Sequence, residues 1–248
     1  MTHSLDKICI AIPLFTSNQQ EISSSIKNAV KMEPNYLEIR FDYIDAVQEI
    51  TPDFLQFILK LNRKVPYIFT FRHHSEGGKR KIDDQKRLRI IQALINAKPQ
   101  FLDIELNTNP NFLREVISNA LKSRVKVIFS YHDFYQTPKY EELEELLQKF
   151  DKKLSGDILQ EQEDLEYVFK VIPTAQTFSD NLIPLKLCKT FSKRGKKIIS
   201  FCMGEKGIFS RILSVKAGSF FTYASLGEKT APGQIDIDVI RRILSFIS

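Results

Sequence analysis

Short runs of apolar, β-branched and aromatic residues alternate along the whole chain with longer segments whose apolar residues recur at helical spacing. The short runs predict eight strands, at Ile8–Pro13, Tyr36–Phe41, Pro66–Phe71, Phe101–Leu106, Val125–Ser130, Tyr167–Ile172, Lys197–Met203 and Ser219–Ala224. The longer segments predict eight helices, near Gln19–Met32, Thr51–Arg63, Asp83–Ala97, Asn111–Ser123, Lys139–Leu154, Ser179–Arg194, Gly207–Val215 and Asp236–Phe246. The pattern therefore consists of eight units, each a strand followed by a helix.

Strands that alternate with helices pair in parallel through right-handed crossovers. Eight such units in 248 residues match the (β/α)8 fold, the TIM barrel of the α/β class. An open doubly wound sheet is the alternative, but it usually has a glycine-rich turn after its first strand, and Pro13–Asn18 contains no glycine. Because no linker or internal repeat divides the chain, we expect one catalytic domain over residues 1–248. The stretch Ser155–Leu165 is expected to be an insertion or an extended loop.

The composition indicates an ordinary globular protein. Hydrophobic residues make up 43% and charged residues 27% of the chain, which excludes a disordered polymer. No apolar run approaches the length of roughly 18 residues that a membrane span needs, and Met1–Lys7 lacks the pattern of a signal peptide. An odd number of cysteines, three, does not suit a disulfide framework. We therefore expect a cytoplasmic protein that does not bind membranes.

The net charge of +6 raises the question of nucleic-acid binding. Basic clusters such as Lys79–Lys81 and Lys193–Lys197 are scattered along the chain and are balanced by acidic runs such as Glu141–Glu145. A nucleic-acid-binding protein concentrates its positive charge and usually contains a known module, and none is found here. The charge suits an enzyme that attracts small anionic substrates.

Polar residues recur at the late positions of successive predicted strands. Along Tyr36–Asp42, the residues Glu38, Arg40 and Asp42 share one face, because side chains alternate in a strand. On each of the next three strands, residues of one parity again include polar groups: Thr70 and Arg72, Asp103 and Glu105, and Ser130 and His132. Since active sites of barrels lie at the carboxyl ends of the strands, these residues predict a polar pocket there.

Lys170 is the sharpest chemical signal. It is a lone charge in the apolar run Tyr167–Ile172, and a buried ammonium without a partner tends to give up its proton. A neutral lysine attacks carbonyl carbons and forms Schiff bases. Taken singly, Lys170 could reach water at the surface and His132 could be a core histidine. Together, on neighbouring strands, they favour a mechanism in which an iminium makes an adjacent proton acidic enough for imidazole to remove.

The chain resembles the type I 3-dehydroquinate dehydratases, which are Schiff-base lyases of the shikimate pathway. The resemblance rests on ordered blocks that cover nearly the whole chain: Leu37–Asp42, Phe69–Arg72 with Glu76–Gly78, Phe101–Leu106, Ser130–Phe134, Lys170, Met203 with Gly207 and Ser210–Arg211, and Ala231–Ile235. The Ser-x-His-Asp-Phe and Ala-Pro-Gly-Gln-Ile blocks are the most specific of these.

The resemblance implies a role for each matching residue. Lys170 would form an imine with the C3 ketone of 3-dehydroquinate, and His132 would remove the C2 proton and then protonate the departing C1 hydroxyl. Glu76 would orient His132. Arg211 would bind the substrate carboxylate, and ring hydroxyls would be held by Glu38, Arg40 and Arg72. A loop with Thr230 and Gln234 would close over the substrate, and Met203 and Phe134 would form apolar walls. The product would be 3-dehydroshikimate, without a metal or cofactor. We also expect a homodimer, although the sequence itself does not reveal the oligomeric state.

Four features depart from the family pattern, and one is Val171–Pro173, which is bulkier than the small residues usual after the lysine. Ala11 and Thr230 stand where related enzymes often have serine, and the Ser155–Leu165 stretch is long. These departures concern substrate contacts and leave Lys170 and His132 in place. Two other functions compete: a class I aldolase-type barrel enzyme, which also uses a Schiff-base lysine, and an inactive binding protein on the same fold. Glu76–Gly78 and the closing loop favour the dehydratase.

Overall fold

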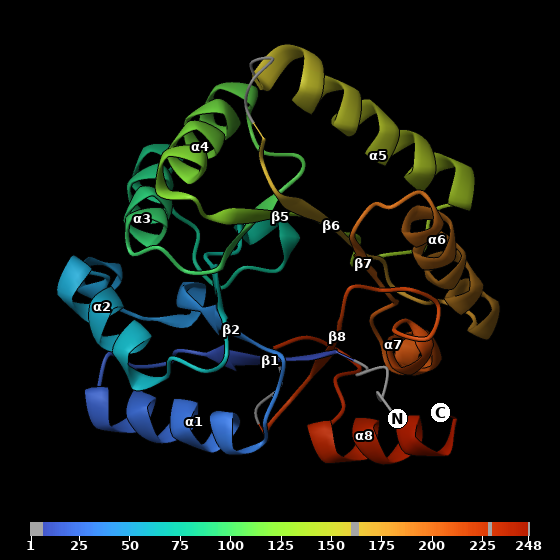
Figure 1. The fold of residues 1–248 in the computed structure, drawn as a ribbon, viewed down its shortest axis with the longest axis horizontal. Helices are drawn as coiled ribbons and strands as arrows, with labels where there is room; N and C mark the ends of the chain where they lie inside the picture. Colours follow the sequence, from blue (N-terminus) through green and yellow to red (C-terminus); the bar gives the residue numbers. More distant parts are fainter. Residues whose placement is uncertain (1–6, 160–163, 228–229, 248) are drawn as a thin grey trace.

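The strands form one eight-stranded parallel sheet that is curled into a barrel (Figure 1). The computed structural model describes residues 7–159, 164–227 and 230–247. The strands are β1 (Ile8–Pro13), β2 (Tyr36–Arg40), β3 (Tyr67–Thr70), β4 (Phe101–Glu105), β5 (Lys126–His132), β6 (Tyr167–Ile172), β7 (Ile198–Ser200) and β8 (Thr222–Ala224). Each strand from β1 to β6 pairs with the strand that follows it, and β1 also pairs with β8.

The barrel closes between β7 and β8. The backbone N–H of Phe220, just before β8, donates to the carbonyl oxygen of Ile198 in β7 over 2.7 Å. This hydrogen bond joins the two ends of the strand order, and the predicted TIM barrel is confirmed.

The helices α1 to α8 surround the strands (Figure 1), and several of their starting points follow from the sequence. Asn18, Thr51 and Asp83 each accept a hydrogen bond from a backbone N–H of the first helical turn, so they act as N-caps. The helices are α1 (Gln19–Lys31), α2 (Pro52–Leu61), α3 (Asp84–Asn96), α4 (Pro110–Ser123), α5 (Tyr140–Lys153), α6 (Leu182–Lys193), α7 (Ile208–Leu213) and α8 (Ile237–Phe246).

The structure corrects several predicted boundaries. The seventh strand ends at Ser200, three residues before its predicted end, because the Cys202 N–H donates to the Ser210 hydroxyl instead of a neighbouring strand. Conversely, β5 continues to His132, two residues past the prediction. Part of the predicted insertion at Ser155–Leu165 is a π-helical turn, Leu154–Ile158, that continues α5. Residues 160–163 of that stretch lie outside the described residues.

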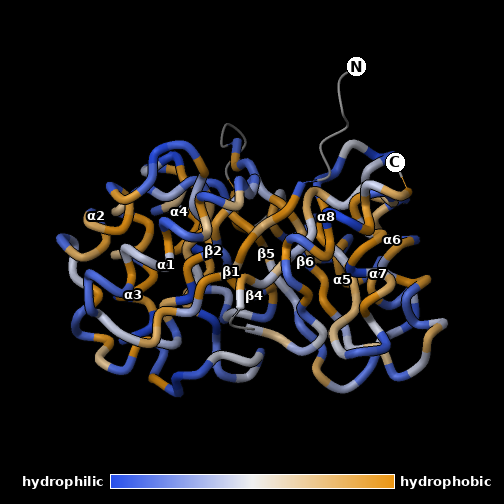
Figure 2. Tube along the Cα trace, turned by 90° about the horizontal axis from the view of Figure 1, so that it is seen from below, coloured by the Kyte–Doolittle hydropathy of each residue, from blue (hydrophilic) through white to orange (hydrophobic). Residues whose placement is uncertain are grey.

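Alternation along the strands sorts the side chains into two layers. Outward residues such as Leu37, Ile39 and Phe129 pack against the helices in the main hydrophobic core. Inside the barrel, a smaller apolar cluster includes Ile68, Phe101 and other aromatic and aliphatic residues. In Figure 2 the hydrophobic colouring runs through the central strands, whereas the loops at the two ends are largely hydrophilic. Polar and charged side chains are therefore buried within the barrel only where strands bring them together.

The contact between β5 and α5 gives a test of this packing. Phe129 is fully buried, and its ring lies 4.8 Å from that of Phe150 in α5. Phe129→Ala should lower the free energy of unfolding by about 3–5 kcal/mol, measured by chemical denaturation. The matched control Phe246→Ala, at a position 78% exposed, should lower it by less than about 0.5 kcal/mol. Equal losses for the two variants would contradict the assigned packing.

Candidate active site

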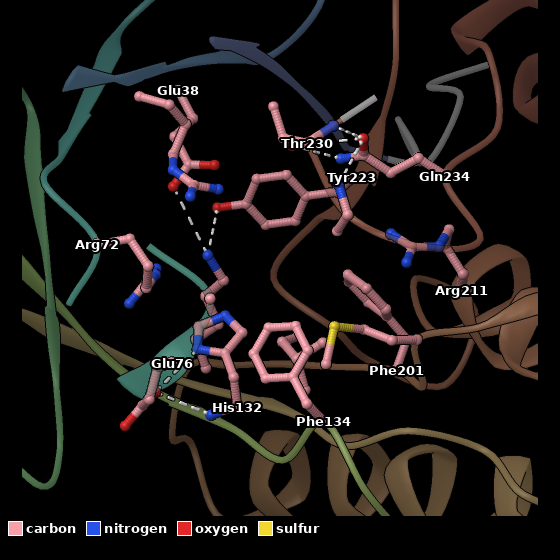
Figure 3. Close-up of a pocket in the computed structure, with 16 residues that line it drawn as sticks. Glu38, Arg72, Glu76, His132, Phe134, Phe201, Arg211, Tyr223, Thr230 and Gln234 are labelled. Atoms are coloured by element: carbon pink, nitrogen blue, oxygen red, sulfur yellow. Dashed lines mark hydrogen bonds and ion pairs between the residues drawn. The ribbon is translucent and has the colours of Figure 1, made fainter. Parts of the chain in front are cut away.

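A pocket of about 530 Å³ opens at the carboxyl ends of the strands (Figure 3). Every site residue predicted from the sequence lines it: Glu38, Arg40, Arg72, Glu76, His132, Phe134, Lys170, Met203, Arg211, Thr230 and Gln234. The strands and loops thus bring together residues that are far apart in the sequence.

Lys170 lies at the base of this pocket, and its side chain is only 6% exposed. Its ammonium donates to Asp103 Oδ2 over 2.9 Å and to the Tyr223 hydroxyl over 3.1 Å, and Glu38 Oε1 lies 3.7 Å away. The prediction of an unpaired ammonium is therefore wrong. The apolar neighbours of Lys170 in the sequence lie beside it on β6, whereas its carboxylate partners come from β2 and β4.

Asp103 is held between two cations. Arg72 Nη2 lies 2.8 Å from Asp103 Oδ1, which also accepts a 2.6 Å hydrogen bond from the Ser130 hydroxyl. Burial by itself raises the pKa of Asp103, but Arg72 and Lys170 outweigh it and hold that pKa well below its usual range. Asp103 is therefore a permanent counter-ion for Lys170 at neutral pH.

The ion pairs continue beyond Arg72. Its Nη1 donates to Glu105 Oε1 over 2.8 Å, and Glu105 also pairs with Arg87 from α3. Positive and negative groups thus alternate from α3 to the centre of the barrel, in the order Arg87, Glu105, Arg72, Asp103 and Lys170. Such a network is favourable because each buried charge has a hydrogen-bonded partner of opposite sign.

His132, at the end of β5, is positioned by Glu76. Glu76 Oε2 lies 3.0 Å from both the backbone nitrogen and the Nδ1 of His132. Glu76 ends a short 3-10 turn (His74–Glu76), after which Gly77 takes a φ of 83°. A side chain at Gly77 would collide with the ring of Phe134, so glycine is needed for Phe134 to pack against this turn.

The environment keeps His132 neutral. Burial, with Arg72 and Lys170 nearby, lowers the pKa of His132 well below its ordinary value. Burial raises the pKa of Glu76 to about 8, although Arg72 opposes that change. When Glu76 is ionised, its Oε2 accepts a hydrogen bond from Nδ1–H of His132. The proton of the neutral imidazole is then on Nδ1, which leaves Nε2 unprotonated. The imidazole can then act as a base.

Arg211, from α7, is a buried cation at another wall of the pocket. Its Nη2 donates to the Pro232 carbonyl over 3.2 Å, and its guanidinium lies 4.3 Å from the centre of the Phe201 ring. Its Nε has no hydrogen-bond partner, and within residues 7–159, 164–227 and 230–247 no carboxylate pairs with it. Burial lowers the pKa of Arg211 to about 9. An unpaired buried guanidinium facing a pocket is suited to receive an anion.

The loop after β8 lies beside Arg211. Gln234 Nε2 donates to the Thr230 hydroxyl over 3.0 Å, and Gln234 Oε1 accepts the Thr230 N–H over 2.6 Å. The Pro232 carbonyl accepts hydrogen bonds from Arg211 and from the Gly204 N–H. These bonds place the loop at the rim of the pocket.

Comparison with known proteins assigns the chain to a family. Residues 10–248 match the family model described as Type I 3-dehydroquinase. The chain belongs to the type I 3-dehydroquinase family. The resemblance inferred from the sequence is confirmed, and the enzyme is a type I 3-dehydroquinate dehydratase, a lyase of the shikimate pathway. This assignment favours the dehydratase over the aldolase and inactive alternatives.

Relatives agree over nearly the full length. A 3-dehydroquinate dehydratase from Methanococcus maripaludis strain C6 is 34% identical over 240 residues, which cover 96% of this chain and 99% of the relative. The crystal structure of 3-dehydroquinate dehydratase from Geobacillus kaustophilus, 23% identical, shares the fold with a TM-score of 0.83 over 98% of this chain and 91% of its own. The type I enzyme from Clostridium difficile with covalently modified comenic acid is 26% identical, with a TM-score of 0.80 over 98% and 92% of the two chains.

Sequence reasoning missed some pocket residues. Gly77, Ile172, Phe201, Tyr223 and Ala231 also line the pocket of the enzyme. Asp103, the closest partner of Lys170, was expected only to share the polar face of its strand. The signal for Tyr223 was its parity with Phe221, the residue just before β8, since both belong to the cluster inside the barrel. None of the helices in the described residues combines the length and apolar character of a membrane span.

Removing the charge of Asp103 tests the ion-pair network. Asp103→Asn leaves Arg72 and Lys170 buried without their shared counter-ion, so it should destabilise the fold by about 3–5 kcal/mol at pH 7. Because the folded-state pKa is lowered, the contribution of Asp103 is present above its unfolded pKa of about 3.9 and is lost as the pH falls below it. The difference in free energy of unfolding between Asp103→Asn and the wild type should therefore become smaller below about pH 4.

Chemical denaturation at a series of pH values measures this difference. Asp53→Asn, at an exposed position, is the matched control and should change the free energy of unfolding by less than about 0.5 kcal/mol. If the free energies of unfolding of Asp103→Asn and the wild type differ by the same amount from pH 7 to 3, Asp103 is not an ionised partner with a lowered pKa.

Proposed function

We propose that Lys170 forms the Schiff base in the dehydration of 3-dehydroquinate and that His132 moves the proton. The observation that carries this proposal is the convergence of the Lys170 ammonium and the His132 imidazole on one pocket, beside an unpaired buried arginine. Lys170 attacks C3 as the neutral amine. The proton that its ammonium gave up and a second proton from the same nitrogen both reach the ketone oxygen, which leaves as water, so that an iminium remains. The iminium accepts electrons from the adjacent C2–H bond when a base removes that proton.

His132 is the base. Its Nε2 takes the C2 proton, and the electron pair of that bond forms an enamine with the C3 iminium. The enamine then expels the C1 hydroxyl, which leaves as water with a proton returned from Nε2. Hydrolysis of the remaining conjugated iminium releases 3-dehydroshikimate and restores Lys170. Glu76 keeps Nδ1 hydrogen-bonded, so that Nε2 is the nitrogen that reacts.

The substrate contacts follow from groups that remain available in the pocket. Arg211 binds the carboxylate, since its guanidinium has no anionic partner in the described part of the chain. Arg40 uses Nε and Nη2 for Asp42, at 2.8 and 2.9 Å, so its Nη1 can donate to a ring hydroxyl. Glu38 is the corresponding acceptor on the same strand. Thr230 and Gln234 cover the ring, and Met203 and Phe134 supply apolar walls.

From the sequence, Arg72 was expected to hold ring hydroxyls of the substrate, and we propose a different role. Its guanidinium already contacts Asp103, Glu105 and the Ser130 hydroxyl. We propose that its main effect on the substrate is electrostatic, through Asp103 and through the neutral state of His132. The covalently modified comenic acid in the Clostridium difficile relative supports covalent chemistry in this family.

The reaction requires no metal or cofactor, because the iminium supplies the electron sink. We also propose that residues 1–248 act as one catalytic domain, in a cytoplasmic homodimer. Light scattering on the purified protein tests the dimer, and a monomeric mass would contradict it.

Trapping the imine tests the nucleophile. Borohydride added with 3-dehydroquinate should reduce the imine and leave a covalent adduct that peptide mass spectrometry locates on Lys170. Lys170→Ala should give no adduct and should lose on the order of 10⁴-fold or more in kcat. Lys149→Ala, at an exposed position, is the control and should behave as the wild type. An adduct on another lysine would contradict the assignment.

The acid limb of the pH profile tests the pairing of His132 with Glu76. In the wild type, kcat/KM should rise as the pair loses its proton, and the raised pKa of Glu76, about 8, extends that rise toward alkaline pH. Glu76→Gln still accepts from Nδ1 but has no proton to lose. Its acid limb should therefore shift to lower pH, where the lowered pKa of His132 governs it. Identical limbs from about pH 5 to 9 would show that Glu76 does not titrate with His132.

A further inference from the structure

Tyr223 touches the proposed nucleophile but has no role in the mechanism above. It lies on β8, is 3% exposed and lines the pocket. Its hydroxyl is 3.1 Å from Lys170 Nζ, and the centre of its ring is 4.5 Å from the same nitrogen. In Figure 3 the Tyr223 ring lies between Glu38 on one side and Thr230 and Gln234 on the other, with its hydroxyl toward Glu38.

The Tyr223 hydroxyl accepts a hydrogen bond but does not donate one to a described residue. The Lys170 ammonium can only donate, so the Tyr223 oxygen accepts from it. In the part of the chain that the structure describes, the hydroxyl hydrogen meets no protein acceptor. Burial, with Glu38 nearby, raises the pKa of Tyr223 well above its ordinary value, so the hydroxyl keeps its hydrogen. A free O–H donor therefore lies next to the nucleophile.

Imine formation needs a proton transfer at this place. When the neutral amine of Lys170 attacks C3, the first product carries a positive charge on the nitrogen and a negative charge on the former ketone oxygen. A proton must pass from this nitrogen to that oxygen, two bonds away, before the oxygen can leave. Direct transfer passes through a strained four-membered ring, whereas one hydroxyl that touches both atoms gives a six-membered ring.

We propose that Tyr223 is a further catalytic residue, whose hydroxyl relays this proton. The Tyr223 oxygen takes a proton from Nζ while its own hydrogen passes to the oxygen on C3. The products are a neutral carbinolamine and an unchanged tyrosine, so the step needs no other reactant. This inference rests on the proposed function, because it requires that Lys170 form the imine.

The other groups beside Nζ cannot serve in this way. Asp103 contacts Nζ at 2.9 Å, but its pKa is held well below its usual range, so it has no proton to give. Glu38 lies farther away, at 3.7 Å, and already accepts a 2.6 Å hydrogen bond from the Thr70 hydroxyl. Among the described residues bonded to Nζ, Tyr223 is the neutral group that both accepts and donates.

Tyr223→Phe tests the relay because it removes the hydroxyl and keeps the ring beside Lys170. In rapid-quench experiments with 3-dehydroquinate, borohydride traps the adduct at successive times and mass spectrometry measures it. The adduct should form on the order of 10–10²-fold more slowly in Tyr223→Phe. In D₂O the wild type should show a normal solvent isotope effect on this phase. That effect should be smaller or absent in the variant.

Tyr67→Phe is the matched control. Tyr67 is a buried tyrosine on β3, whose hydroxyl donates to the Ile58 carbonyl over 3.1 Å outside the pocket. The Tyr67→Phe variant should form the adduct at the wild-type rate, even if its free energy of unfolding is lower. Equal adduct rates for Tyr223→Phe and the wild type would overturn the relay and leave the Schiff base intact.

Two further outcomes are decisive. No adduct in the wild type would overturn both the relay and the proposed role of Lys170. If Tyr223→Phe does not fold, the isotope effect on the wild type alone decides, and its absence would overturn the relay.

Discussion

The burial of a lysine inside the barrel is the constraint on which the rest of the site depends. A buried ammonium costs several kcal/mol unless a counter-ion compensates it, and Asp103 does so from two strands away. Asp103 in turn needs Arg72 and Ser130, and Arg72 needs Glu105, which is held by Arg87. The iminium of the proposed mechanism carries the same positive charge as the ammonium. One fixed counter-ion therefore suits both the resting enzyme and the intermediate.

The charges of the site also set the states of His132 and Arg211. Arg72 and Lys170 disfavour a proton on His132, which keeps the imidazole in the form that a base requires. Arg211 stands apart from this network, and no described carboxylate satisfies it. We propose that it receives the substrate anion. In this account the paired Lys170 and Arg72 serve the chemistry, whereas Arg211 serves binding.

The hydrophobic pattern predicted all eight strand and helix units because each short apolar run is followed by a segment of helical spacing, and α1 to α4 also begin at a side-chain N-cap. Strand parity also predicted that Glu38 and Arg40 face inward, opposite Leu37 and Ile39. The pairing of Lys170 with Asp103 could not be predicted, because the two are 67 residues apart and their contact depends on how the barrel closes. Tyr223 was missed because an aromatic residue in the apolar run Phe220–Ala224 looks like core packing. The oligomeric state stays a prediction.

A crystal structure of the borohydride-reduced complex with 3-dehydroquinate tests the account most directly. It should show continuous density from Lys170 Nζ to C3 of the ligand, the ligand carboxylate on Arg211, and His132 Nε2 facing C2. Asp103 should still lie within hydrogen-bond distance of the modified nitrogen. A ligand bonded elsewhere, or a carboxylate bound away from Arg211, would contradict the account.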